Sequence, residues 1–183
     1  MTIRARVRFI ADDIWDTPED GKIYEVIDGQ LYVSPTPAWI HQRVIARLFF
    51  FIAQHVFGNG LGEVVTAPTG LRLDEENGIE PDIIYVSNER RGIISERGLE
   101  GAPDLVVEVL SPSTQARDRG IKLRRYAASG VPHYWILDPI ERKLEERVLT
   151  ERGYELVGVF GEQDVFRPTL FPGLEIRLAD LWS

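Results

Sequence analysis

One acidic residue stands in the middle of an otherwise aliphatic run. Glu108 lies within LVVEVL, residues 105 to 110, where every neighbour is Leu or Val. An ionised carboxylate is costly to bury, so Glu108 must be neutralised, paired with a positive group or bound to a cation. Asp82 raises the same question less strongly, because it opens the aliphatic run IIYV and can stay partly solvated there. These two acids are the first candidates for a site.

Asp82 and Glu108 together have the chemistry of a divalent-metal site. Two carboxylates on neighbouring strands suffice to bind Mg²⁺ or Mn²⁺, because water and substrate phosphate complete the ligand shell. A metal held in this way polarises a phosphoryl oxygen and lowers the pKa of a bound water, which then attacks phosphorus. The expected chemistry is hydrolysis of a phosphodiester bond.

Lys122 is the expected third catalytic residue. An ammonium beside the two carboxylates could orient the attacking water and stabilise negative charge that develops on phosphate. Lys122 lies four residues after Asp118 and four before Tyr126, so these three residues share one stripe of a helix. Asp118 and Tyr126 are expected to support Lys122. An ordinary Asp-to-Lys helix pair explains the same spacing, and only the neighbourhood of Glu108 favours the catalytic role.

Two further residues are weaker catalytic candidates. Glu25 lies between Ile23 and Ile27 in an expected strand, where it could point inward as an extra carboxylate, although half-exposed hairpin glutamates are commoner. His41 opens an expected helix and could contact phosphate or a catalytic water, although a structural role is commoner for a histidine at a helix end.

Four arginines near Lys122 are candidates for contacts with a nucleic-acid backbone. The segment RDRGIKLRR, residues 117 to 125, contains Arg117, Arg119, Arg124 and Arg125. A solvated helix face explains such a run equally well. The formal net charge of −8 argues against a protein that coats nucleic acid, so any phosphate contact must be local.

Apolar periodicity and turn residues predict the elements that position these side chains. Asp28-Gly29 between two alternating runs predicts a hairpin over residues 23–33, and a 3.6-residue apolar period predicts a helix over 39–57. The other expected elements are buried strands at 81–86, 104–110 and 133–139, paired short strands at 63–66 and 70–73, a helix over 114–129 and a meander from residue 143. This order predicts an α/β (α+β) fold, a mixed β-sheet flanked by helices, with an N-terminal hairpin and a C-terminal β-meander.

Length and composition predict one domain over residues 1–183. The apolar share of 44% and the charged share of 27% are ordinary for a soluble globular protein, and the absence of cysteine excludes disulfides and thiolate metal sites. The N-terminal stretch MTIRARVRFIADDIWD lacks the apolar segment of a signal peptide, and the apolar run over 44–56 is interrupted by polar residues. We therefore expect a cytoplasmic protein.

Several segments together resemble the Uma-type restriction endonuclease family. They are EPD at 80–82, VEVLSPST at 107–114, the D-x-x-x-K-x-x-x-Y stripe at 118–126, GVPHYWILDP at 130–139, and the hairpin YEVIDGQLYVSPTP with the following His41. The resemblance extends roughly from Tyr24 to the C-terminus. The family is assigned to the PD-(D/E)XK nuclease superfamily, which has the restriction endonuclease-like fold.

The resemblance implies a DNA endonuclease that depends on Mg²⁺ or Mn²⁺, with Asp82 and Glu108 as the metal ligands. The lysine of the family signature would stand two residues after Glu108, but Leu110 occupies that position. The resemblance implies that Lys122 takes its place from the following helix. A homodimer is expected, because two symmetric sites are the simplest way to cut both strands of a duplex.

Two other functions remain open at this point. The chain could keep the nuclease fold as a weak or inactive enzyme that binds nucleic acid or protein, consistent with its acidic charge and with Leu110. It could also be a metal-dependent phosphodiesterase that acts on a small substrate.

Overall fold

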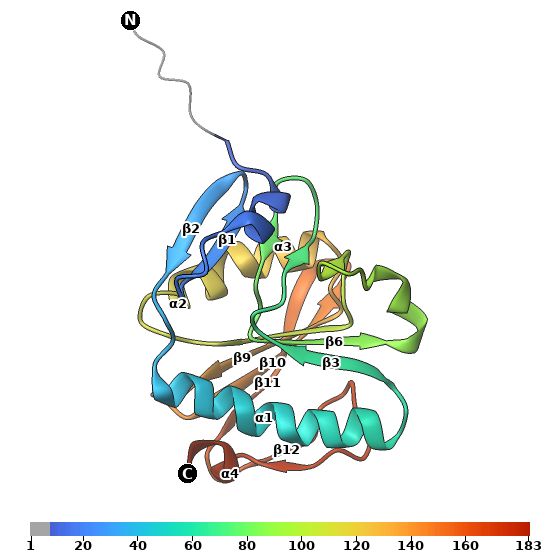
Figure 1. Ribbon diagram of the computed structural model, residues 1–183. Helices are drawn as coiled ribbons and strands as arrows, with labels where there is room; N and C mark the ends of the chain where they lie inside the picture. The colour runs from blue at the N-terminus through green and yellow to red at the C-terminus, as the bar shows by residue number, and fades with distance from the viewer. Residues whose placement is uncertain (1–7) are drawn as a thin grey trace, which may run out of the picture.

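A six-stranded β-sheet forms the centre of the computed structural model, which describes residues 8–183 (Figure 1). Its strands, in spatial order, are β11 (Gly153–Gly161), β10 (Lys143–Thr150), β9 (His133–Asp138), β8 (Leu105–Val109), β6 (Ile83–Ser87) and β3 (Gly62–Thr66). Strands β8 and β9 are parallel and the other neighbours are antiparallel, so the sheet is mixed. Residues 1–7 lie outside the described part. They belong to the expected domain and to the N-terminal stretch that was compared with a signal peptide.

Helices cover both faces of this sheet. Helix α1 (Trp39–Gly58) packs Val44 and Leu48 into one apolar cluster with Val107 of β8, and it crosses the sheet in Figure 1. On the opposite face, Tyr126 of α3 (Leu123–Ala128) packs with Val106 of β8. Alternate residues of β8 therefore face different helices, as strand geometry requires. The predicted mixed sheet flanked by helices is confirmed.

The N-terminal hairpin belongs to a second sheet, with the spatial order β2-β1-β5-β4-β7. Its strands are β1 (Ile23–Ile27), β2 (Gln30–Ser34), β5 (Gly78–Ile79), β4 (Leu71–Arg72) and β7 (Leu99–Glu100). Asp28 and Gly29 have φ angles of 54° and 69°, the two positive values that a tight two-residue hairpin turn requires. The predicted hairpin is confirmed.

The predicted pairing of segments 63–66 and 70–73 is wrong. β3 pairs with β6 in the six-stranded sheet, whereas β4 pairs with β5 and β7 in the other sheet. β6 offers β3 five paired positions, whereas β4 is only two residues long, so β3 satisfies more backbone groups on β6. The chain changes sheets between residues 66 and 71.

The predicted helix over 114–129 is interrupted. It consists of α2 (Gln115–Arg117), a π-helical turn η3 (Asp118–Lys122) and α3. A π turn contains one residue more than an α-helical turn and is frequent at functional sites. Within η3, Asp118 and Lys122 are the buried residues, so the widened turn directs both charged side chains inward.

The C-terminal part forms the predicted meander and then returns to α1. β10 and β11 pair at the sheet edge, with a register shift after Glu146. The remaining elements are a two-stranded sheet of β12 (Val165–Phe166) and β13 (Ile176–Arg177), the terminal helix α4 (Ala179–Trp182), and the 3₁₀ helices η1 (Ala11–Asp16) and η2 (Asn88–Ile93). Arg43 of α1 donates a hydrogen bond of 3.0 Å to the carbonyl of Trp182, which ties the C-terminus to α1. No helix within residues 8–183 is long and apolar enough to cross a membrane.

Candidate active site

The register of two neighbouring strands brings Asp82 and Glu108 together. Ile83 pairs with Val107 in the antiparallel ladder of β6 and β8. The next position in this register places Asp82 opposite Glu108. The backbone N–H of Val109 also donates a hydrogen bond of 2.6 Å to Asp82 Oδ2, which fixes this carboxylate beside β8.

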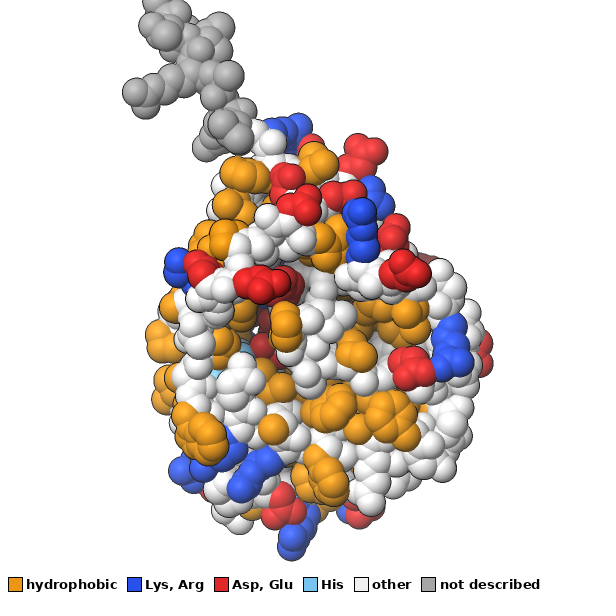
Figure 2. Space-filling view, in the orientation of Figure 1, with side chains coloured by type: hydrophobic (Ala, Val, Ile, Leu, Met, Phe, Trp, Pro, Cys, Tyr) orange, Lys and Arg blue, Asp and Glu red, His pale blue; other side chains and the backbone are white. Residues whose placement is uncertain are grey.

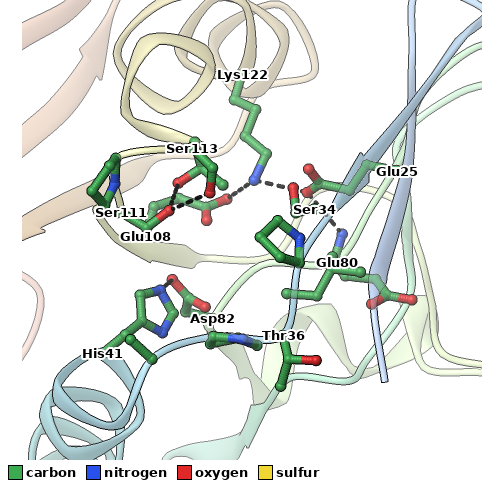
Figure 3. Close-up of a pocket in the computed structure, with 16 residues that line it drawn as sticks. Glu25, Ser34, Thr36, His41, Glu80, Asp82, Glu108, Ser111, Ser113 and Lys122 are labelled. Carbon is green, nitrogen blue, oxygen red and sulfur yellow. Dashed lines mark hydrogen bonds and ion pairs between the residues drawn. The ribbon is translucent and has the colours of Figure 1, made fainter. Parts of the chain in front are cut away.

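Lys122 reaches the same place from the π turn. Its Nζ lies 2.9 Å from Glu108 Oε1, 2.8 Å from Glu25 Oε1 and 3.2 Å from Asp118 Oδ1. Figure 3 shows the lysine side chain descending between Glu108 and Glu25. Leu110, at the position where the family signature has its lysine, lies in the apolar core. The ammonium at this site therefore comes from the helix, and it contacts the carboxylate of Glu108.

Glu25 and Tyr126 complete the polar network around Lys122. The carboxylate of Glu25 is 2% exposed and is directed inward from β1, so the inward orientation considered from the sequence is the one present. Tyr126 donates a hydrogen bond of 2.6 Å to Glu108 Oε1 from α3. The Asp118–Lys122–Tyr126 stripe thus acts as one unit, because two of its members contact Glu108 and the third contacts Lys122.

His41 approaches the site from the first turn of α1. Its Nε2 lies 3.4 Å from Asp82 Oδ2, and the side chain is buried. Burial lowers the pKa of His41, but the hydrogen bond and the charge of Asp82 raise it more strongly, so the net pKa is above its usual value. Asp82 consequently favours the protonated form of His41.

Glu80 also belongs to the site, although its place in the sequence indicated no role for it. It lines the same cavity as Asp82, and its backbone N–H donates a long hydrogen bond of 3.4 Å to Glu25 Oε1. Burial, and then the charge of Glu25, raise the pKa of Glu80 to about 7. The sequence feature that could have identified Glu80 is its spacing of two residues from Asp82, which places both side chains on one side of an extended segment.

Burial controls the charge state at the centre of the site. It raises the pKa of Glu108 well above its usual range; Lys122 opposes this change, while nearby carboxylates add to it. Burial lowers the pKa of Lys122, but the three surrounding carboxylates outweigh this effect and raise it well above its usual value. Lys122 therefore stays an ammonium and is the internal counter-ion of the network.

These side chains line a cavity of about 240 Å³. Figure 2 shows its opening as a recess with acidic side chains at the bottom. Its charged and titratable lining residues are Glu25, Glu80, Asp82, Glu108, Lys122 and His41. Four carboxyl groups thus line the cavity together with one ammonium and one histidine, so its lining is rich in oxygen ligands.

The donor set fits a divalent cation held by two carboxylates. No group of three or more potential metal-ligating side chains is arranged around one point within residues 8–183. In the same range, Asp82 Oδ1 and Glu108 Oε2 accept no hydrogen bond, since the contacts of both residues fall on their other oxygens. Mg²⁺ commonly takes one or two protein carboxylates and completes its shell with water and substrate phosphate. Asp82 and Glu108 match that pattern.

The four arginines proposed for backbone contacts lie outside this cavity. Arg117 donates to Ser34 and stacks over Tyr32, Arg119 pairs with Glu145, and Arg125 pairs with Asp28 at 2.5 Å. Arg124 is exposed and makes no ion pair with the described residues. Three of the four guanidinium groups therefore hold elements of this chain together.

Comparison with known proteins gives a family and a fold. The model of the Uma2 family, described as "Putative restriction endonuclease", matches residues 12–179. An uncharacterized protein of Synechocystis sp. is 32% identical over 114 residues, which are 62% of this chain and 58% of that protein's length. This chain thus spans little more than half of that relative.

A solved structure has the same fold. The crystal structure of a protein from Anabaena variabilis, described as a "putative nuclease belonging to DUF820", superposes with a TM-score of 0.78 at 19% identity, over 95% of this chain and 97% of that one. This chain therefore has the same fold as that protein. Because the family model covers nearly all of the described residues, this chain belongs to the Uma2 family of restriction endonuclease-like proteins.

Proposed function

We propose that this protein is a metal-dependent endonuclease that hydrolyses phosphodiester bonds of DNA. The observation that carries the proposal is the contact of Lys122 with Glu108 in the cavity that Asp82 also lines. Two carboxylates and one ammonium are the groups that the chemistry requires, and they come from three separate segments of the chain. Membership of the Uma2 family supports the same reaction class.

In this proposal each residue has a defined task. Asp82 and Glu108 hold Mg²⁺ or Mn²⁺, which supplies positive charge to polarise a phosphoryl oxygen and to activate water. Lys122 orients the attacking water and stabilises the charge that develops on phosphate. Glu25, Asp118 and Tyr126 keep Lys122 and Glu108 in place, because each contacts one of these two side chains.

His41 has a separate task on the other side of Asp82. Its Nε2 is near Asp82 Oδ2, and the ring lines the cavity, so a protonated His41 can contact a phosphate oxygen at the entrance. Glu25 also lines the cavity, so Glu25 and His41 stay among the catalytic candidates, with Asp82, Glu108 and Lys122. Arg124 is the arginine best able to contact the DNA backbone, because it is exposed and makes no ion pair within residues 8–183.

The test is cleavage of supercoiled plasmid, linear duplex and single-stranded DNA by the purified chain with Mn²⁺, Mg²⁺ or EDTA. We expect cleavage that depends on the metal, together with a rise in melting temperature on addition of Mn²⁺. The Asp82→Asn variant should lose both effects, and Asp164→Asn, which alters a loop outside the cavity, should lose neither.

The two other functions are distinguished by the same experiment. DNA binding without cleavage, unchanged in Asp82→Asn, would contradict the enzyme and support a binding module. Cleavage of a small phosphodiester such as bis(p-nitrophenyl) phosphate, with no salt-dependent binding of a duplex, would support the small-substrate phosphodiesterase. The homodimer stays a prediction, and light scattering of the purified chain measures it.

A further inference from the structure

A second, larger cavity adjoins the catalytic cavity. It has a volume of about 940 Å³ and shares Glu80 with the catalytic cavity. We call it the Trp15 groove and define it by Trp15, Val65, Gly70, Glu80, Ile94 and Arg97. Figure 2 shows apolar side chains gathered beside the acidic recess on one face of the molecule. The proposed catalytic site therefore continues into a space large enough for part of a substrate.

The indole of Trp15 forms a flat wall of this groove. Its ring lies against Gly70, where an added Cβ would come within 2.5 Å of Trp15 Nε1, so the absence of a side chain at Gly70 makes room for the ring. The guanidinium of Arg97 lies 5.9 Å from the ring centroid. Stacking platforms for bases are built from aromatic rings and arginine planes of this kind.

The polar groups of the Trp15 groove suit a base better than a phosphate. Lys22 and Arg91 already pair with Asp20 and Glu63, and the lining contains four glutamates against three basic residues. Such a surface does not favour an anion, but its carboxylates can accept hydrogen bonds from exocyclic amino groups. The buried Nε1–H of Trp15 lies against Gly70, so Trp15 offers a base its aromatic surface and not a hydrogen bond.

We propose that the Trp15 groove binds an unpaired nucleobase of the strand whose phosphodiester lies in the catalytic cavity. The inference rests on the proposed function and narrows its substrate to nucleic acid with at least one unpaired nucleotide next to the cleaved bond. A base inside a duplex cannot stack on Trp15, because its faces are covered by its neighbours. Bases with an exocyclic amino group are preferred over thymine, because thymine has only its ring N3–H to donate to a glutamate.

Binding is measured in EDTA, so that cleavage does not occur, with duplexes that carry 2-aminopurine either paired or in a one-nucleotide bulge. We expect tighter binding and a larger fluorescence change for the bulged duplex. Trp15→Ala should weaken binding of the bulge by about 5- to 100-fold, as loss of one stacking contact does elsewhere. Trp15→Phe, which keeps an aromatic face, should stay within about threefold of the parent chain.

Phe50→Ala is the matched control, because Phe50 is another exposed aromatic residue, 60% exposed on α1 and absent from the lining of both cavities. It should bind the bulge as the parent chain does. Equal affinity for paired and bulged duplexes, or unchanged binding by a folded Trp15→Ala, overturns the inference. A Trp15→Ala effect on self-association alone, seen by light scattering, also overturns it and assigns the groove to a second copy.

Failure of this inference is distinguishable from failure of the proposed function. Cleavage of fully paired DNA at the same rate by the parent and by Trp15→Ala would overturn the base-binding role and leave the nuclease intact. Trp15-dependent binding of the bulge without cleavage of any nucleic acid would remove the nuclease and leave the base-binding role intact. Neither binding nor cleavage would overturn both.

Discussion

Two buried glutamates on the central sheet differ in the face of the sheet they occupy and in the groups they contact. Glu108 on β8 is 4% exposed and Glu146 on β10 is 1% exposed. Glu146 pairs with Trp135, which pairs with Val107, so Glu146 shares the face that α1 covers. Glu108 is directed to the opposite face, toward α3. One sheet thus carries a buried acid on each side.

The partners of the two carboxylates explain their different roles. Glu146 Oε1 accepts hydrogen bonds of 2.8 Å from both the backbone N–H and the hydroxyl of Thr169, which fasten the C-terminal segment to the sheet. Glu108 contacts the charged Lys122 and lines a cavity. Burial of an acid therefore does not by itself indicate catalysis. Glu108 differs from Glu146 in having a cationic partner and an adjoining cavity, and these two features support its catalytic role.

The largest expected difference between the two glutamates is in catalysis. Glu108→Gln should reduce metal-dependent DNA cleavage by about 100-fold or more, as expected for loss of a charge that acts on the transition state. Glu146→Gln keeps an acceptor oxygen for Thr169 and should cleave at nearly the parental rate. Initial rates on supercoiled plasmid measure both, and equal losses would show that the two sites do not differ in the way proposed.

Removal of the cation should be the largest change in stability. Lys122→Met leaves the carboxylates of Glu25, Glu108 and Asp118 buried without their counter-ion, which should cost about 3–5 kcal/mol of unfolding free energy. Lys143→Met, on the exposed end of β10, should change it by less than about 1 kcal/mol. Urea denaturation compares the two. A small effect of Lys122→Met would mean that the network does not need its ammonium.

Truncation of the other glutamate should destabilise the chain without affecting the reaction. Glu146→Ala removes the acceptor shared by two donors of Thr169, and because Thr169 is exposed, water can partly replace it, so the loss should be about 1–2 kcal/mol. Cleavage per folded molecule should not change, since Glu146 is absent from the lining of the catalytic cavity. Urea denaturation and cleavage below the unfolding transition provide the two measurements. A specific loss of activity in the folded variant would contradict the separation of the two sites.

The pH dependence of stability should have opposite signs in the two regions. The pKa of Glu80 is raised to about 7, so its contribution is fully present below its unfolded pKa and is lost as pH rises through 7. Burial lowers the pKa of His133, at the start of β9, against the opposing charge of Glu146. The contribution of His133 is therefore present above its unfolded pKa, near 6.5, and is lost as pH falls below that value.

Melting temperatures between pH 4.5 and 8.5 test these signs without added metal. Glu80→Gln should flatten the decline between pH 4.5 and about 7, by on the order of 1 kcal/mol after solvent screening. His133→Gln should flatten the decline below pH 6.5. Parallel curves for the parent chain and both variants would show that neither group controls the pH dependence.

The strands and the central site residue could be predicted from the sequence where a local pattern was unambiguous. Glu108 was evident because all its neighbours are aliphatic, whereas Glu146 in KLEERVLT was not, because charged residues surround it in the sequence and only the sheet buries it. Glu25 and His41 were weak candidates because strand or helix position does not tell which side faces a cavity. Lys122 was found through its stripe with Asp118, although its contact with Glu25 needed tertiary structure.

Other features depended on contacts that no local pattern encodes. The pairing of β3 with β6 depends on a longer partner that becomes adjacent only in the folded sheet. The internal pairing of Arg117, Arg119 and Arg125 depends on residues 26 to 97 positions away in the chain, as Asp28, Ser34 and Glu145 show. The apolar residues around the π turn follow a spacing close to that of an α-helix, so sequence periodicity could not distinguish a π turn from an α-helical turn.

The extra residue of the π turn also limits how the protein can change in length. Deletion of a single codon within residues 119–121 would remove the extra residue and return this segment to a regular α-helical turn. Lys122 would then be carried by a turn of 3.6 residues, and its Nζ should lose the position that the wider turn gives it between Glu25, Glu108 and Asp118. Length variation among related genes should therefore be concentrated in turns such as residues 151–152, between β10 and β11, and be rare in this one turn.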